Sequence, residues 1–534
     1  MTSRLYPLVC LLLLGGCIAH PGMVHPVKFA SDARTVVATT RTGAVRGIEG
    51  AGVRAFLGLP YAAPPIGDQR WRAPQPAEPW TGIRDATRIG SDCVQALGRR
   101  AVLGGGGGIV VGSEDCLSVN VYAPAGEVEQ PRPVMVYLHG GAFTIGAGGN
   151  YDPSRLAKEQ DRVVVTVNFR LGALGWLVHP DFEGAGGNFG LRDQQAALRW
   201  VQANIATFGG DPADVTLFSE SSGAWSACHL MAAPSSQGLY SRVILQSGPC
   251  LEPSSLNAQA DQVGPGEVFA ERLGCAGEGV VDCLRRFPAW KIARAASQQS
   301  GINGPGSWGP VYGDALVPLS PAEAFATGRF VRTPVIVGSN ADEGRLFAVE
   351  VRDADRYADE TRWLYGDAGE GALAHYPVSD ADGKSRWAIA IAQSFTDSRF
   401  ACPSDALRRV LSKWVPTYGY EFADQNAPFR LPAWITGLKM GAYHASEATY
   451  VFGTSWIFAD TGKWTPDQRV LSDRMMRLWA GFGHDPAFDA AWPKVNDGGG
   501  PVLRFDPAGD RVDPDFFDAH QCSFWGGTAL GAPV

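Results

Sequence analysis

A serine at a sharp turn between a strand and a helix is the residue whose setting most directly predicts chemistry. Residues 215–224 read Val-Thr-Leu-Phe-Ser-Glu-Ser-Ser-Gly-Ala, with Ser221 at the apex of the turn. Such a nucleophile elbow pushes the hydroxyl out above a sheet and needs small residues two positions before and after it. Ser219 and Gly223 occupy those positions, so the segment departs from G-x-S-x-G at Ser219. Taken alone, it fits a nucleophile and also a plain helix cap.

A serine hydroxyl attacks a carbonyl only when an imidazole takes its proton and a carboxylate orients that imidazole. After such an elbow, the acid and then the histidine follow along the chain. Glu343 comes after the apolar run 335–337 and the turn 338–340, at the strand edge where open α/β sheets bind ligands. Asp342 is its rival, since an acidic pair beside a glycine also fits a solvated turn. The histidines beyond Glu343 are His375, His444, His484 and His520.

A glycine-rich loop offers the remaining chemistry. Residues 139–143 read His-Gly-Gly-Ala-Phe and follow the apolar run 134–138. Acyl transfer develops negative charge on the carbonyl oxygen, and backbone N–H groups of such a loop can stabilise that charge. A plain turn is the alternative interpretation of the two glycines.

The elements that must position these residues read as alternating strands and helices. Continuous apolar runs, typical of strands buried on both faces of a parallel sheet, occupy 134–138, 162–167, 215–218, 243–245 and 334–337. More helical stretches such as 191–205 lie between them, and a short β-rich region opens the domain near 36–38 and 43–45. This rhythm predicts an α/β fold with a doubly wound sheet. The five glycines 104–108 and the segment 253–309, with helical pieces but no strand, are expected to be excursions from the sheet.

Motifs spread along the chain carry a resemblance to a known family. They lie at 58–62, 64–65, 114–117, 120–122, 139–143, 188–194, 204–205, 208–212, 342–344 and 522–525, and they lead into and out of the elbow. Together, over about residues 36–526, they closely resemble the type-B carboxylesterase and cholinesterase-like family, nearest to its bacterial carboxylesterases.

The resemblance implies the α/β-hydrolase fold. Its large, mostly parallel central sheet has helices on both faces and helical or loop excursions over the active site. It also implies a serine carboxylic-ester hydrolase that works through an acyl-enzyme on small to medium esters, with a small-molecule ester as partner and no cofactor or metal. Residues 441–447 look like the family's catalytic-histidine segment. The implied triad is therefore Ser221, Glu343 and His444, with an oxyanion hole formed by Gly141, Ala142 and Ser222.

The cysteines fit an exported protein. Of ten cysteines, Cys10 and Cys17 fall in the leader, and the even number left suggests disulfides. The family resemblance implies the pairs Cys93 with Cys116, Cys275 with Cys283, and Cys402 with Cys522. Cys228 and Cys250 have no partner in that scheme, so pairing with each other and buried free thiols both stay open, with pairing preferred.

Substrate and alternative functions are less well specified. In cholinesterases a tryptophan within the first disulfide loop binds quaternary ammonium, but residues 93–116 contain no tryptophan, which argues against choline esters. The glycine run in that loop is instead expected to form a mobile or open pocket rim. Trp225 is expected to be a core residue, and contact with the acyl pocket is the alternative. A long-chain lipase with a lid in 253–309 is one alternative, and a non-catalytic relative that only binds is another. The intact set of triad residues argues against the latter.

The net charge and the N-terminal residues limit the possible location and partners of the protein. The formal net charge of −8 and the lack of a Lys/Arg cluster argue against nucleic acid as a partner. Residues 1–19 are expected to be a signal peptide, 20–34 a flexible segment, and 35–534 a single domain. Residues 14–17, Leu-Gly-Gly-Cys, resemble a bacterial lipobox, so lipidation of Cys17 and plain cleavage near Ala19 both remain open. The protein is thus expected to be secreted or a cell-envelope lipoprotein anchored to a membrane surface, of unspecified oligomeric state.

Overall fold

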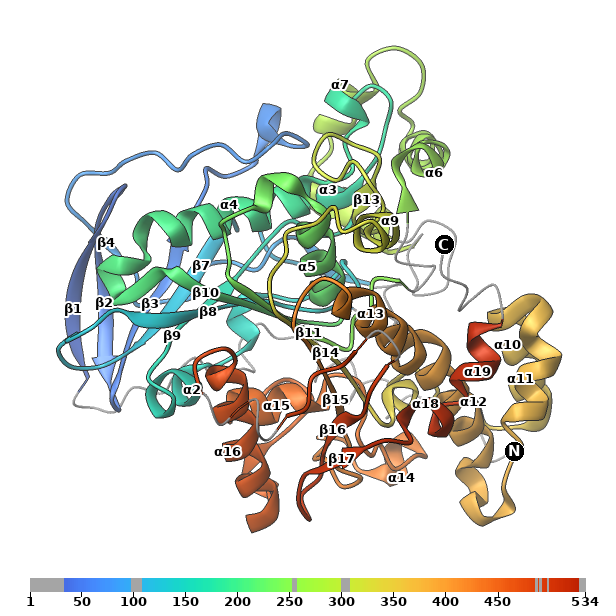
Figure 1. Ribbon diagram of the computed structural model, residues 1–534. Helices are drawn as coiled ribbons and strands as arrows, with labels where there is room; N and C mark the ends of the chain where they lie inside the picture. Colours follow the sequence, from blue (N-terminus) through green and yellow to red (C-terminus); the bar gives the residue numbers. More distant parts are fainter. Residues whose placement is uncertain are drawn as a thin grey trace, which may run out of the picture. The chain divides into compact units, whose positions relative to one another are not determined.

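Figure 1 presents the protein as a computed structural model. It describes residues 33–97, 108–251, 257–298, 308–485, 488, 492–496 and 499–527. The expected signal peptide, most of the segment 20–34 and glycines 104–107 lie outside the described residues. The chain divides into two compact units, a first of residues 1–242 and 257–320 and a second of 243–256 and 321–534. The single domain expected for 35–534 stays a prediction.

The strands of the first unit form an antiparallel start that leads into parallel strands. Their order is β1 (Arg34–Thr40), β2 (Gly43–Gly50), β3 (Val53–Pro60), β7 (Ser118–Pro124), β9 (Val163–Val167), β8 (Arg132–Leu138) and β10 (Gly210–Glu220). β7 runs antiparallel to β9, while β9, β8 and β10 are parallel. Every residue of β9 is buried, as its apolar sequence predicts.

Helices of the first unit join these strands. α4 (Phe189–Asn204) precedes β10 and α5 (Ser222–Ala232) follows it directly. The segment expected to lack strands contains α6 (Gln259–Arg272), α7 (Val280–Arg285) and α8 (Ala289–Ser297), but also the two-residue strand β12 (Asn257–Ala258). β12 pairs with β13 (Val311–Tyr312), so the expectation of no strand is wrong at that point. A strand of two residues is too short to show a periodic pattern in the sequence.

The strands of the second unit run parallel to one another, except for the last one. Their order is β11 (Arg242–Gln246), β14 (Val335–Asn340), β15 (Thr417–Phe422), β16 (Val502–Phe505) and β17 (Arg511–Asp513), with β17 antiparallel to β16. All five apolar runs singled out in the sequence are therefore strands, and the predicted α/β class is confirmed.

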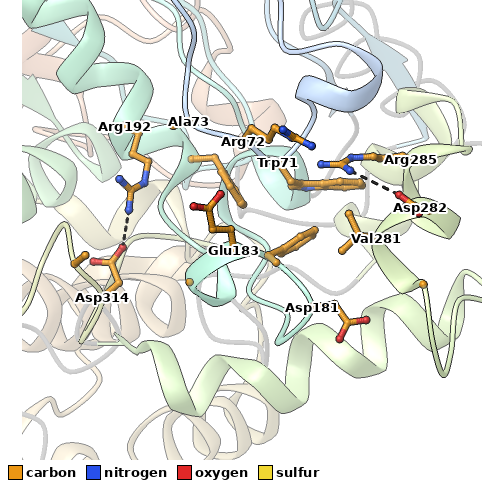
Figure 2. A pocket seen from close by; sticks show the side chains of 16 residues that line it. Trp71, Arg72, Ala73, Asp181, Glu183, Arg192, Val281, Asp282, Arg285 and Asp314 are labelled. Atoms are coloured by element: carbon orange, nitrogen blue, oxygen red, sulfur yellow. Dashed lines mark hydrogen bonds and ion pairs between the residues drawn. The ribbon is translucent and has the colours of Figure 1, made fainter.

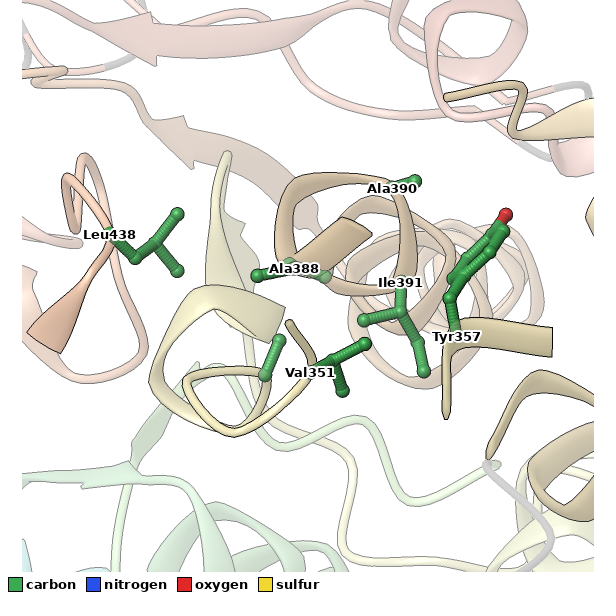
Figure 3. Packing of buried hydrophobic residues seen from close by; sticks show 8 residues of the cluster. Val351, Tyr357, Ala388, Ala390, Ile391 and Leu438 are labelled. Atoms are coloured by element: carbon green, nitrogen blue, oxygen red, sulfur yellow. The ribbon is translucent and has the colours of Figure 1, made fainter. Parts of the chain in front are cut away.

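The helices of the second unit carry much of its core. They include α10 (Ala354–Tyr365), α11 (Gly369–His375), α12 (Arg386–Thr396), α13 (Cys402–Ser412), α15 (Ser446–Phe452) and α16 (Pro466–Gly481). Figure 3 shows side chains of α10, α12 and the loop around Leu438 meeting in one cluster, with Ile391 and Tyr357 among them. This cluster supports α12, which contacts the turn that carries Glu343. Among the helices of the described residues, none combines the length and the apolar character of a membrane span.

Candidate active site

Ser221 occupies a strained turn in the first unit. β10 ends at Glu220, α5 begins at Ser222, and Ser221 between them has φ 55° and ψ −128°. A residue with a side chain adopts such a backbone only at a cost of about 1–3 kcal/mol, and such strain clusters at functional sites. The predicted strand–turn–helix around Ser221 is thus present, and the serine lies at its apex.

The elbow requires a glycine after the serine. A Cβ on Gly223 would lie 2.2 Å from the carbonyl oxygen of Leu138, the last residue of β8. Two residues before the serine, Ser219 is fully buried and pairs in register with Leu138. The chain therefore needs glycine only on the helix side of the turn, while the strand side accepts the small hydroxyl side chain.

The glycine-rich loop lies against Ser221. A Cβ on Gly140 would be 2.8 Å from the Cβ of Ser221. The next residues, Gly141, Ala142 and Phe143, all have positive φ, at 120°, 51° and 60°. The N–H of Phe143 donates to Oγ of Ser222 at 3.3 Å, which ties the loop to the first turn of α5.

Three backbone donors lie at this junction. Within the part of the chain that the structure describes, the N–H groups of Gly141, Ala142 and Ser222 have no hydrogen-bond acceptor. Ser222 is buried, whereas Gly141 and Ala142 are partly exposed, and a buried peptide N–H without a partner is rare in proteins. An oxyanion that forms beside the serine is the kind of acceptor that would satisfy them.

His139 supports the loop rather than the chemistry. Its Nδ1 donates to the carbonyl oxygen of Gly140 at 2.7 Å, and its ring stacks on Phe169 with centroids 4.4 Å apart. Burial lowers the pKa of His139 to about 4, so the ring is neutral at ordinary pH.

The second unit holds an acid–base pair. Glu343 begins a 3₁₀ turn (Glu343–Leu346) just beyond β14, and its Oε2 lies 2.6 Å from Nδ1 of His444. The N–H of Asn340 donates to the other carboxylate oxygen at 2.8 Å. Both side chains are buried, and the imidazole packs against Phe347 and Phe400. Since the carboxylate accepts from Nδ1–H, Nε2 is the basic nitrogen of the ring.

Asp342 makes structural contacts instead. Its carboxylate pairs with Arg345 at 2.7 Å and accepts from the N–H of Ala442 at 2.9 Å. Among the other histidines, His375 is exposed and lies 3.4 Å from Gln521, and His520 contacts two carboxylates of its own. The structure therefore brings Glu343, and not Asp342, together with His444.

Known proteins resemble this chain over most of its length. The sequence model of the family described as Carboxylesterase family matches residues 34–525. The chain belongs to the carboxylesterase family. It is 36% identical to fumonisin B1 esterase of Sphingopyxis macrogoltabida, covering 88% of this chain and 86% of that protein. It is 34% identical to para-nitrobenzyl esterase of Bacillus subtilis, covering 86% and 93%.

A solved structure supports the same assignment. A structure titled PNB esterase aligns with a TM-score of 0.76 and 31% identity, covering 92% of this chain and 99% of that one. The fold of this carboxylesterase is therefore the α/β-hydrolase fold, as the motifs predicted, and the protein is an ester hydrolase.

Sequence reasoning missed a second buried acid in the carboxylesterase. Glu447 on α15 accepts from Asn340 at 2.6 Å and from Gln246 at 3.1 Å. Burial, and next the nearby charge of Glu343, raise the pKa of Glu447 to about 7. The sequence signal for Glu447 is its place in the segment 441–447, but the resemblance of that segment points only to the histidine.

Replacing Glu447 with glutamine should flatten the pH dependence of stability. A carboxyl group whose pKa is raised in the folded state keeps its proton between about pH 4.5 and 7, whereas the unfolded chain releases it. Stability therefore falls with rising pH across that window, by roughly 3 kcal/mol for this group. Urea unfolding of both proteins at the two ends of the window should give a smaller loss for Glu447→Gln. Equal losses in both proteins would contradict the shift.

Disulfides fasten several segments. Cys93 is bonded to Cys116, Cys275 to Cys283, and Cys402 to Cys522. Cys228 and Cys250 are disulfide-bonded as well, so neither is a free thiol. In the first loop, β5 (Gln95–Leu97) pairs with β6 (Ile109–Val111) on either side of the glycine run.

A cavity of about 770 Å³ in the first unit is lined by none of the candidate site residues. Trp71 and Phe182, with ring centroids 5.5 Å apart, contribute its aromatic lining. Figure 2 shows ion pairs on two sides, Arg192 with Asp314 and Arg285 with Asp282. Trp225, which was expected to be a core residue, is only partly buried. Its ring lies 6.0 Å from that of Phe143 in the glycine-rich loop.

Proposed function

We propose that this carboxylesterase hydrolyses small to medium carboxylic esters in two steps, with Ser221 as nucleophile, His444 as base and Glu343 as orienting acid. Oγ of Ser221 attacks the carbonyl carbon while Nε2 of His444 takes the hydroxyl proton. The tetrahedral intermediate collapses, and the imidazolium returns that proton to the departing alcohol. Water, activated by the same imidazole, then releases the acid and frees the serine.

The observation that carries the proposal is the 2.6 Å hydrogen bond between Glu343 and Nδ1 of His444. A buried carboxylate on Nδ1 fixes the tautomer that a general base needs and stabilises the imidazolium that forms. The positive φ of Ser221 gives independent support, because strain of that kind exposes a nucleophile.

The N–H groups of Gly141, Ala142 and Ser222 are the proposed oxyanion hole. Donors aimed at the developing negative charge are often worth about 3–4 kcal/mol of barrier each. Because these donors belong to the backbone, the serine side chain at 222 does not need to take part in the stabilisation.

Esters of moderate size are the proposed substrates. The relatives named above are esterases, which favours neither a long-chain lipase nor a binding protein. The absence of tryptophan from residues 93–116 argues against quaternary ammonium esters.

A series of p-nitrophenyl esters tests the substrate class. We expect kcat/KM to be greatest for short or medium acyl chains and to fall at least about tenfold for the palmitate. A maximum at the palmitate, or a jump in rate above its solubility limit, would instead identify a lipase.

Activity should decline as the pH falls. Protonation of His444 removes the base that accepts the serine proton, so kcat/KM should decrease about tenfold per pH unit on the acid side. The profile is best measured with a p-nitrophenyl ester in a buffer without thiols. The pH should stay below the value at which the ester hydrolyses without enzyme. A rate that rises into acid would rule out this role for His444.

Export across a membrane is also proposed. The disulfides of the described residues suit an oxidising compartment. The apolar run near residues 5–14 suits a signal peptide, and Cys17 suits lipidation, although both lie outside the described residues.

A further inference from the structure

A buried ionic cluster lies in the second unit apart from the proposed triad. Nδ1 of His520 is 2.5 Å from Oδ1 of Asp397, and Nε2 is 2.7 Å from Oε1 of Glu421. All three residues are at most 8% exposed. Ionised carboxylates only accept hydrogen bonds, so His520 can donate to both of them only as an imidazolium, with a proton on each nitrogen.

The surroundings balance this charge. Glu421 also accepts from Arg504, which lies opposite it on β16, and Asp397 accepts from the hydroxyl of Tyr376 at 2.7 Å. Burial raises the pKa of Asp397, an effect that the neighbouring His520 opposes. With His520 as an imidazolium, the two carboxylates face two cations, and removing its charge would then leave a net negative charge in the interior.

Asp397 begins an unusual helical turn. A π-helical turn (Asp397–Ala401) interrupts the helix between α12 and α13, and such turns occur frequently at functional sites. Within this turn the ring of Phe400 packs against the imidazole of His444, with centroids 5.0 Å apart. One residue before it, Oγ1 of Thr396 accepts from the N–H of Gly344 at 2.9 Å.

These contacts connect the turn to both members of the acid–base pair. Gly344 directly follows Glu343, and a Cβ there would lie 2.0 Å from the carbonyl oxygen of Ala392 on α12. The helix α12 and the 3₁₀ turn that carries Glu343 are thus tightly packed. A shift of the π-helical turn at Asp397 must therefore move Glu343, the ring of Phe400 beside His444, or both.

We infer that His520 is a positioning residue for the Glu343–His444 pair. Its imidazolium holds Asp397 and thereby fixes the π-helical turn that packs against both partners. The segment carrying His520 is fastened by the disulfide between Cys402, at the end of that turn, and Cys522. The inference rests on the proposed function, because it assigns a task only if the pair is catalytic.

The test compares His520→Gln, which loses the charge, with His520→Arg, which keeps it. Titration with an organophosphate gives the concentration of competent sites, so kcat is expressed per titrated site. We expect His520→Gln to lower kcat about 10- to 100-fold with KM within about twofold. His520→Arg should recover most of that loss. The matched control is His375→Gln, which alters an exposed histidine against the same C-terminal segment and should change neither parameter.

Alternative outcomes separate this inference from the proposed function. A normal kcat per site in His520→Gln, with fewer titratable sites, would mean that the cluster only stabilises the fold, and the inference would be wrong. The same holds if His520→Arg is as impaired as His520→Gln. If His520→Gln does not fold, Tyr376→Phe removes one donor to Asp397, together with the acceptor of the Trp525 indole N–H, and should lower kcat per site about threefold. An unchanged kcat there would also overturn the inference. Activity that survives Ser221→Ala would refute the proposed function instead.

Discussion

Replacement of Ser221 by alanine is expected to lower kcat by about 10⁵- to 10⁶-fold while leaving the fold intact. The hydroxyl of Ser221 is the group that we propose to form the acyl-enzyme, and no other side chain of the elbow is expected to take its place. Glu220 belongs to the strand and Ser222 to the helix, so only Ser221 has the strained backbone of the apex. Turnover of p-nitrophenyl butyrate and circular dichroism spectra of both proteins measure the two effects.

The matched control is Ser226→Ala. Ser226 lies one turn further along α5, and its hydroxyl accepts from Gln194 at 3.1 Å. This variant loses a buried hydroxyl from the same helix but should keep kcat within about threefold, at a stability cost of about 1 kcal/mol. Full activity in Ser221→Ala would refute the nucleophile, whereas equal inactivation of both variants would point to damage of the helix.

Replacement of Glu343 by glutamine is expected to lower kcat by about 10⁴-fold. The N–H of Asn340 donates to Oε1 of Glu343, so the oxygen of a glutamine amide would stay there and its NH₂ would face His444. An amide donor at Nδ1 forces the ring proton onto Nε2, and Nε2 then cannot accept the serine proton. The loss thus arises from the wrong tautomer, with the geometry largely preserved.

Asp342→Asn is the control for that variant. Asp342 is the neighbouring acid, but its contacts are with Arg345, Gln425 and the N–H of Ala442. The control should be less stable by about 1–2 kcal/mol and keep kcat within about threefold. The acid assignment fails if Asp342→Asn is inactive and Glu343→Gln is not.

Five of the parallel strands were predictable because each contains a continuous apolar run, whereas β15 and β16, with polar residues among the apolar ones, were not predicted. Val134, Val163, Val215, Val243 and Val335 all begin or lie in such runs, and all are fully buried. The elbow was only partly predictable from local pattern, because the crowding that excludes a side chain at Gly223 comes from Leu138 on another strand.

The choice between Glu343 and Asp342 could not be made from local pattern. The two are adjacent, and which carboxylate reaches the histidine depends on contacts with residues about a hundred positions away. Only the family resemblance favoured Glu343 in the sequence.

The partners of His520 were out of reach for the same reason. Glu421 and Arg504 meet because their strands are neighbours, and Asp397 joins them from a helix. A buried charge cluster assembled from separate elements leaves no spacing in the sequence that would reveal it.

The most direct test of the central claim is mass spectrometry after labelling with an organophosphate ester. We predict a single stoichiometric adduct on the peptide containing Ser221, loss of hydrolysis in proportion to labelling, and no adduct on Ser221→Ala. An adduct on any other residue that accompanies full inactivation, or undiminished labelling of Ser221→Ala, would contradict the assignment of Ser221 as the nucleophile.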